Sequence, residues 1–412
     1  MANKRLESEE ARAKELLKES LPALITGGAG DDPAGVLTYT VVGATTGFSQ
    51  LWLLVLSTPM LAAANSMAAR IAVAAHDGLA AVVRKRYGRA AALIIVLVLA
   101  IANIATIAAD AAGVASALQI ATGVRWEFFV PLILVSLLVV LHRGYTQIKR
   151  ILVFLTAVLL AYVAAAIMAK PDWAALLQAT FAPHIGGHKA WTMASLGLLG
   201  TTISPYLLFW QAGEEVEELQ EGITIQASET GLGVWPGMVY SNLIAFFIIV
   251  AAAMTIHAGG GHIQSVADAA QALAPLGKAG VAIFIVGIVG SGLLALPVLA
   301  GSTAYAIAEL MGWPEGFGAR GAHARGFLVV LVAALGGGML ISLWPNFRPA
   351  EALYYSQVLD GVLLPVLMLI LLVLSNDRRV VGSAKNPLWV NGIAAFTILI
   401  AFAADAAALV LH

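Results

Sequence analysis

The chain has 412 residues, of which 60% are hydrophobic and 11% are charged, and its formal net charge is -1. Soluble domains carry roughly 25% charged residues, so the composition excludes a water-soluble protein. Long apolar runs such as residues 90–109 show no alternation, which excludes a membrane β-barrel and leaves a helical membrane protein.

The first 20 residues mix Lys, Arg and Glu without an apolar run, so they do not resemble a signal peptide. Eleven hydrophobic segments follow, and we predict that each forms a membrane-spanning helix. Their ranges are 21–47, 49–75, 90–119, 127–142, 149–168, 190–214, 233–256, 278–310, 325–344, 350–375 and 387–410. The predicted organisation is a cytoplasmic segment over 1–20, a ten-helix core over 21–375, and a cytoplasmic loop with an eleventh helix over 376–412.

The distribution of basic residues predicts the orientation. Eleven spans place 18 of the 23 Lys and Arg at the end of the bundle that holds the N-terminus, and the other five are Arg125, Lys170, Lys189, Lys278 and Arg348. The excess of basic residues predicts a cytoplasmic N-terminus.

The first predicted span is interrupted by the sequence GGAGDDPAG at residues 27–35. Pro33 removes a backbone donor and clashes with the preceding turn, and the glycines lower the helix propensity. We therefore expect the helix to unwind here, which would leave carbonyl oxygens beside Asp31 and Asp32. Such a place binds a cation.

The sixth predicted span contains a second break, in the sequence GLLGTTISPY at residues 197–206. Two interrupted helices that lie five spans apart are typical of an inverted-repeat transporter with its site at the bilayer midplane. The two repeats would cover about 21–168 and 190–375, giving a 5+5 arrangement in an all-α protein.

Four further carboxylates fall inside predicted spans, where ionisable groups are costly and mark candidate functional positions. Glu309 and Asp405 lie near span ends and are expected at the interface. Asp110 and Asp360 lie deeper. Asp110 is either a proton relay or a carboxylate held by hydrogen bonds for structure, and the sequence leaves both readings open.

At these positions the chain resembles the NRAMP family of divalent-metal transporters over nearly its whole length. The family's DPGN motif corresponds to DPAG at residues 32–35, and its sixth-span A-x-x-MPH motif corresponds to TTISPY at residues 201–206. Shorter matches are KPDW at 170–173, SN at 241–242 and SQV at 356–358. The resemblance implies a LeuT-like fold, in agreement with the repeat argument.

The resemblance also implies a set of metal ligands. The metal-binding Asp matches Asp32, whereas the family's Asn and Met ligands are replaced by Gly35 and Ser204. Thioether sulfur favours soft transition metals, and its loss favours a hard, partly hydrated ion such as Mg²⁺. The implied site comprises Asp32, carbonyl oxygens near Ala29 and Thr201, and the positions of Gly35, Ser204, Tyr206 and Gln357.

The proton route of the family is altered in this sequence. Its His pair falls on Tyr206 and Gln211, which do not titrate near neutral pH, and its third-span acidic pair becomes Asp110 and Gly113. These substitutions resemble the NRAMP-related magnesium transporter branch, which implies transport of Mg²⁺ and Mn²⁺ without coupled protons. Residues expected along the ion's route or around its water shell are Asp31, Asp110, Gln211, Glu214, Glu215 and Asp360.

Two alternatives remain within the transporter class: a proton-coupled Mn²⁺/Fe²⁺ transporter, and a carrier of an organic solute on the same fold. No HExxH or GxSxG motif occurs inside the spans, so an enzyme is not expected. The sequence contains no Cys, which removes thiolate metal sites. The resemblance implies divalent ions as substrate and no cofactor, and a monomer is the default for the implied fold. The Ala-rich spans, with no targeting peptide, are typical of a bacterial inner membrane, and the basic residues in short loops predict no nucleic-acid partner.

Overall fold

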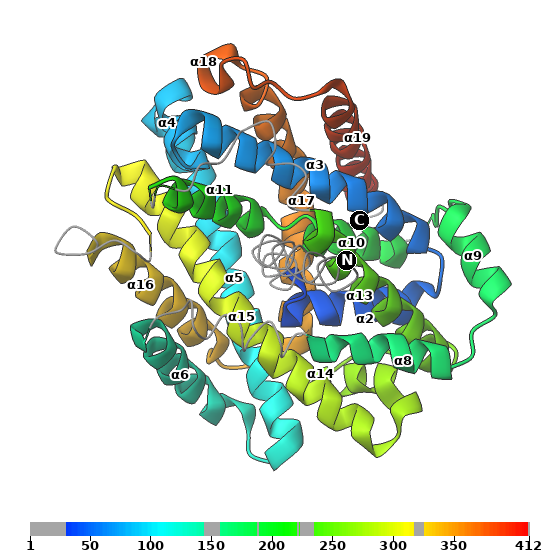
Figure 1. The fold of residues 1–412 in the computed structure, drawn as a ribbon. Coiled ribbons are helices and arrows are strands. Elements are labelled where there is room, and N and C mark those ends of the chain that lie inside the picture. The colour runs from blue at the N-terminus through cyan, green and yellow to red at the C-terminus, as the bar shows by residue number, and fades with distance from the viewer. Residues whose placement is uncertain are drawn as a thin grey trace, which may run out of the picture.

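The computed structural model describes residues 30–143, 157–187, 189–220, 222, 235–316 and 325–410, and every element in these ranges is helical. Figure 1 shows the helices gathered into one bundle. The predicted N-terminal segment, the first half of the first span, Ala29 and the start of the fifth span lie outside the described residues.

Helices occur where the hydrophobic segments predicted them. They are α2 (Pro33–Thr46), α3 (Leu51–Ala75), α5 (Arg89–Thr122), α6 (Phe129–Arg143), α8 (Ala161–Met168), α10 (Lys189–Thr202), α11 (Pro205–Gln220), α13 (Trp235–Ala252), α15 (Lys278–Met311), α16 (Arg325–Ser342), α17 (Pro349–Leu374) and α19 (Leu388–Val410). Short turns extend α6, α8 and α13: η1 (Trp126–Phe128), η2 (Ala157–Leu160) and η3 (Ala253–His257). In the described part, eight helices are long and apolar enough to cross a membrane, or nine if the bent pair over 158–168 and 173–181 is one span.

Four connections contain helical elements that the sequence did not predict. They are α4 (Leu79–Tyr87), α9 (Trp173–Phe181), α14 (Val266–Ala269) with η4 (Ala270–Leu276), and α18 (Arg378–Val381). The helix over 158–168 and α9 meet at 120°, so α9 turns away from the fifth span. Asp172 begins α9, because its carboxylate accepts the N–H groups of Ala174 and Ala175 at 2.9 and 3.2 Å.

Glu309 corrects one expectation. It lies near the end of α15, as expected, but it does not face water, since only 3% of its surface is exposed. Its carboxylate accepts the N–H groups of Ala80 and Ala81 at 2.7 and 3.2 Å, so it satisfies free donors in the first turn of α4. A side chain at Gly78 would overlap this carboxylate. Glu309 therefore fixes α4 to the end of α15.

The packing agrees with two related halves. The third and eighth spans, α5 and α15, are both 34 residues long, and they pack extensively against each other. Helices α2, α10 and α17 also contact one another, and Figure 1 shows α6, α9 and α19 at the periphery of the bundle. The two broken spans are thus surrounded by other helices, and their polar groups are shielded from lipid.

Candidate cation site at the two helix breaks

The first break lies at Asp31 and Asp32, between a helical Gly30 and the start of α2. Asp32 has extended backbone angles (φ -66°, ψ 169°), and its carboxylate accepts the N–H of Gly35 at 2.5 Å. Pro33 occupies the first helical position, where its missing N–H costs nothing. Asp32 is therefore the N-cap of α2, and it lies at the positive end of the helix dipole.

The second break lies at Ile203 and Ser204, between α10 and α11. Pro205 begins α11 in the same way that Pro33 begins α2. The Ser204 hydroxyl donates to the carbonyl oxygens of Gly200 and Thr201, both at 3.0 Å. Its own oxygen retains lone pairs that could accept a bond or coordinate a cation.

The two breaks meet at Asp32. The Tyr206 hydroxyl, in the first turn of α11, donates to Asp32 Oδ2 at 3.1 Å. A Cβ atom at Gly35 would lie 2.8 Å from Thr201 Oγ1 and 3.1 Å from the Gly30 carbonyl oxygen. The structure therefore brings together four residues of the implied ligand set: Asp32, Gly35, Thr201 and Tyr206.

Helix α17 packs against one side of the region where the two helix breaks meet. A Cβ at Gly200 would overlap the backbone carbonyl of Gln357, so α10 and α17 touch through their backbones. The Gln357 side chain is fully buried, and its Oε1 has no hydrogen-bond partner among the described residues. The same holds for Thr201 Oγ1. One buried oxygen beside Gly35 and one on α17 thus remain unsatisfied, as a site for a cation or its water shell requires.

Asp110 lies on α5 and is fully buried. Its Oδ1 accepts the N–H of Ala34 in the first turn of α2, at 3.0 Å. This hydrogen bond gives Asp110 a structural role at the first break, which was one of the two readings left open by the sequence. Its Oδ2 has no partner within the described part of the chain, and Asp110 also interacts electrostatically with Asp32 and Asp360.

Asp31 and Asp32 are adjacent in sequence but face different helices. Asp31 Oδ1 accepts the hydroxyl of Ser241 on α13 at 3.0 Å, whereas Asp32 faces Tyr206 on α11. Asp360, on α17, is 2% exposed and interacts electrostatically with Asp32. The break region therefore concentrates carboxylates from two helices, α5 and α17, and from one unwound segment.

Gln211, Glu214 and Glu215, which we expected along the ion's route, lie beyond Tyr206 toward the C-terminal end of α11. This helix continues to Gln220, six residues beyond the predicted end of the sixth span at residue 214, and Glu214 and Glu215 are helical. Gln211 donates to Glu215 at 2.9 Å. Glu215 lies nine residues after Tyr206, about 13 Å along the helix axis, so the structure does not place it at the break.

The site differs from a chelating metal centre. In the ranges that the structure covers, no group of three or more His, Cys, Asp or Glu side chains is arranged to hold a metal ion. The donors are one carboxylate, a phenol, hydroxyls, an amide and backbone carbonyls. Arg70 on α3 is the only fully buried basic side chain among the described residues. Buried carboxylates without a neighbouring base favour neutralisation by a bound cation or by protons.

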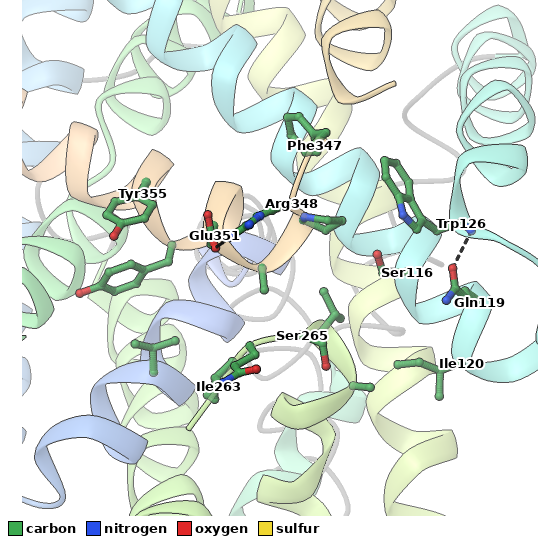
Figure 2. Close-up of a pocket in the computed structure, with 17 residues that line it drawn as sticks. Ser116, Gln119, Ile120, Trp126, Ile263, Ser265, Phe347, Arg348, Glu351 and Tyr355 are labelled. Carbon is green, nitrogen blue, oxygen red and sulfur yellow. Dashed lines mark hydrogen bonds and ion pairs between the residues drawn. The ribbon is translucent and has the colours of Figure 1, made fainter. Parts of the chain in front are cut away.

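A large cavity opens at one end of the bundle, with a volume of about 840 Å³. Figure 2 shows its walls: Ser116, Gln119 and Ile120 from α5, Trp126 from η1, Ile263 and Ser265 from the connection before α15, and Phe347, Arg348, Glu351 and Tyr355 around the start of α17. Arg348 and Glu351 pair at 2.6 Å.

The cavity stops short of Asp32. Val41 on α2 is a lining residue, and it lies nine residues from Asp32, about 13 Å along the helix. Tyr354 also lines the cavity, and a Cβ at Gly197 would lie 3.3 Å from its ring and 3.1 Å from Thr38. A packed layer formed by Thr38, Gly197 and Tyr354 therefore separates the cavity from the break.

Sequence reasoning missed several polar groups at this layer. The Tyr39 and Thr202 hydroxyls lie 3.2 Å apart and join the two broken helices, and Thr38 Oγ1 is buried without a partner in the described part. The available signal was the run of three hydroxyl residues at 38–40 in an apolar helix. It gives no indication of which hydroxyl faces the other break.

Broken first and sixth spans that meet at a buried carboxylate define a multi-pass membrane protein of the inverted-repeat class. The family model described as Nramp, natural resistance-associated macrophage protein-like, matches residues 23–411. The chain belongs to the Nramp family.

Relatives and a solved structure agree with this assignment. The chain is 26% identical to the divalent metal cation transporter MntH of Granulibacter bethesdensis over 92% of this chain and 85% of the relative. It is 25% identical to MntH of Pectobacterium carotovorum over 97% and 96% of the two chains. It is also similar to the solved structure of a manganese transporter from Eremococcus coleocola, with a TM-score of 0.74, 19% identity, and coverage of 95% and 86%. The likeness confirms the LeuT-like fold.

Proposed function

We propose that this chain transports divalent metal cations, favouring Mg²⁺ and tolerating Mn²⁺. The observation that carries the proposal is the meeting of the two helix breaks at Asp32, where Tyr206, Gly35 and Thr201 converge on one buried carboxylate. The relatives are named divalent metal cation transporters, which supports the substrate class.

The preference for Mg²⁺ is inferred from the donor atoms. Asp32 would bind the ion with carbonyl oxygens near Ala29 and Thr201, and Ser204 and Gln357 would add oxygen donors. Gly35 and Tyr206 would shape the space around it. Mg²⁺ retains several waters and needs one or two carboxylates. A hydroxyl at Ser204, rather than a thioether, removes the advantage of a softer metal.

The remaining acidic and amide groups would act on the hydrated ion. Asp31, Asp110 and Asp360 would supply negative charge around the break, and Gln211, Glu214 and Glu215 would line the route along α11. Asp360 lies one turn beyond Gln357 on α17, where it could accept a hydrogen bond from a water of the ion.

We infer alternating access without coupled protons. The two positions at which the family resemblance implies His are Tyr206 and Gln211, so no imidazole is available there. The membrane potential supplies the driving force, about 2.3 kcal/mol per charge per 100 mV, or about twice that for a divalent ion. The layer formed by Thr38, Gly197 and Tyr354 would open to admit an ion from the 840 Å³ cavity.

The proposed topology follows from the basic residues. A cytoplasmic N-terminus places the cavity on the external side and α4 and α18 on the cytoplasmic side of a bacterial cell membrane. Residues 21–375 would form the transporter core, 376–412 a cytoplasmic loop with an added helix, and the protein would act as a monomer.

One observation favours a second candidate, a proton-coupled Mn²⁺ transporter: the structural relative is named a manganese transporter. Competition between Mg²⁺ and Mn²⁺ for uptake distinguishes the two candidate functions. Mn²⁺ uptake into proteoliposomes should be suppressed by external Mg²⁺ at comparable concentration if the site prefers hard cations. Mn²⁺ uptake that persists in a large excess of Mg²⁺ would favour the second candidate.

A further inference from the structure

The loop between α17 and α19 is built around a network of side-chain amides. Asn376 and Asn391 exchange two hydrogen bonds, at 2.8 and 3.0 Å. Asn386 donates to Ser375 at 2.7 Å and to Asn391 at 3.0 Å. Ser375 and Asn386 are buried. This network fixes both ends of the loop without using its basic side chains.

Two of the three basic side chains of the loop line a pocket of about 490 Å³, whose lining residues are Arg378, Gly382, Ser383 and Lys385. All four residues are exposed. The loop's own acid is occupied elsewhere: Asp377 pairs with Arg86 of α4 at 2.5 Å and accepts the N–H of Arg379 at 2.9 Å. Neither Arg378 nor Lys385 forms an ion pair with another described residue.

The pocket lies in the connection between two apolar helices. The apolar helix α17 ends at Leu374, and α19 begins at Leu388, so the pocket residues lie between two spans. Leu388 is 88% exposed and Trp389 is 50% exposed. An exposed Trp at the start of a span is typical of the headgroup region. Figure 1 shows α18 at the outer edge of the bundle.

We propose that this pocket binds the phosphate headgroup of an anionic phospholipid. A guanidinium donates a planar pair of N–H groups to phosphate, and an ammonium adds a point charge. The Ser383 hydroxyl adds a donor, and Gly382 leaves the backbone accessible. Basic residues immediately next to the cytoplasmic end of a span attract anionic headgroups. Leu388 and Trp389 offer apolar surface to the attached acyl chains, which favours a lipid over free phosphate.

The proposal is tested by lipid binding to the delipidated full-length protein, measured by native mass spectrometry. Short-chain phosphatidylglycerol is compared with phosphatidylcholine and with inorganic phosphate. The variant Arg378→Gln/Lys385→Gln should bind phosphatidylglycerol roughly twenty-five-fold more weakly, since each base that faces an anionic headgroup contributes about a factor of five. Arg379→Gln is the matched control, because this exposed base lies in the same loop but does not line the pocket.

Support requires saturable binding of phosphatidylglycerol that exceeds that of phosphatidylcholine and is weakened only in the double variant. Equal binding by the double variant and the wild type would overturn the proposal, as would equal affinity for the two lipids. Inorganic phosphate binding as tightly as phosphatidylglycerol would assign the pocket to a soluble anion and overturn the lipid assignment. A thermal unfolding curve of each variant in detergent shows whether it is folded.

Discussion

Two carboxylates from different parts of the chain stabilise the first turn of α2. Asp32 accepts the N–H of Gly35, and Asp110 accepts the N–H of Ala34. These donors would otherwise be unpaired at the helix start, and the helix dipole favours negative charge there. The same arrangement keeps two acids buried close together without a base, so the empty site is costly and a cation lowers its free energy.

Ser204 is expected to control the choice of metal. The change Ser204→Met should introduce a thioether at the second break and shift preference from Mg²⁺ toward Mn²⁺. The ratio of Mn²⁺ to Mg²⁺ uptake in proteoliposomes should rise at least several-fold. Ser204→Leu is the control for size, because it adds similar volume without sulfur. An equal shift in the Leu variant would show that bulk, not sulfur, determines the ratio.

Gly35 is expected to be required for steric reasons. A Cβ at this position would lie 2.8 Å from Thr201 Oγ1, closer than normal packing allows. Gly35→Ala should therefore lower the thermal unfolding temperature, and Thr201→Ala in the same chain should restore part of the loss. A double variant no more stable than Gly35→Ala would refute this contact as the cause.

The sequence predicted the positions of the two helix breaks, because proline and glycine disrupt a helix. Pro33, Pro205 and the neighbouring glycines predicted both breaks, and the buried charge of Asp32 followed from its place in a span. The partners across the bundle could not be predicted. Nothing in the sequence indicates that Tyr39 meets Thr202 or that Asp110 reaches Ala34, because these contacts depend on helix rotation and packing.

At the scale of elements, α10 and α17 cross with backbone contact. A Cβ at Gly361 would overlap the Leu196 carbonyl oxygen. Gly361→Ala should therefore destabilise the protein by about 1–3 kcal/mol, measured as a lower unfolding temperature. Gly336→Ala is the matched control on α16, since nothing lies within 4 Å of its added carbon. Gly336→Ala should leave the unfolding temperature unchanged or raise it. A similar decrease in both variants would contradict the role of the backbone contact between α10 and α17.

The membrane spans could be predicted because each needs a long apolar run. The helices of the connections could not, because α4, α9 and α18 are short and depend on tertiary partners. Helix α4 begins against Glu309, which is 229 residues from Ala80. The extension of α11 to Gln220 was also missed, because the Glu residues after residue 213 end the hydrophobic run. A charged helix that leaves the membrane has no hydrophobic signal.

At the scale of the whole molecule, the two ends of the bundle differ. One end opens into the 840 Å³ cavity. At the other end, Arg84 donates to the Leu310 carbonyl at 3.4 Å and Tyr305 donates to Glu217 at 2.6 Å. Glu309 fixes α4 to α15 at this same end. Access from that end requires these contacts to rearrange, whereas access from the cavity requires only the layer of Thr38, Gly197 and Tyr354 to open.

Glu315, in the loop after α15, should make stability depend on pH. Burial, with the nearby carboxylates of Asp77 and Glu217, raises its pKa from 4.5 to about 7, against a smaller opposing effect of Arg84. The native state therefore binds this proton more tightly than the unfolded state. Its contribution is fully present below pH 4.5 and is lost as the pH rises through about 7.

The test compares thermal unfolding of the wild type and Glu315→Gln between pH 5 and 8. The unfolding temperature of the wild type should fall relative to that of the variant as the pH increases. A constant difference between the two proteins across this range would contradict the raised pKa.

The proposed transport of a hard cation requires Asp32 as a ligand of the ion. The measurement is ion uptake into proteoliposomes that contain a Mg²⁺ indicator and, in parallel, a pH indicator, with wild type and Asp32→Ala. We expect Mg²⁺ to enter liposomes that contain the wild type, without a change in luminal pH, and we expect no Mg²⁺ entry with the variant. Mn²⁺ entry with luminal acidification and without Mg²⁺ entry would contradict this proposal.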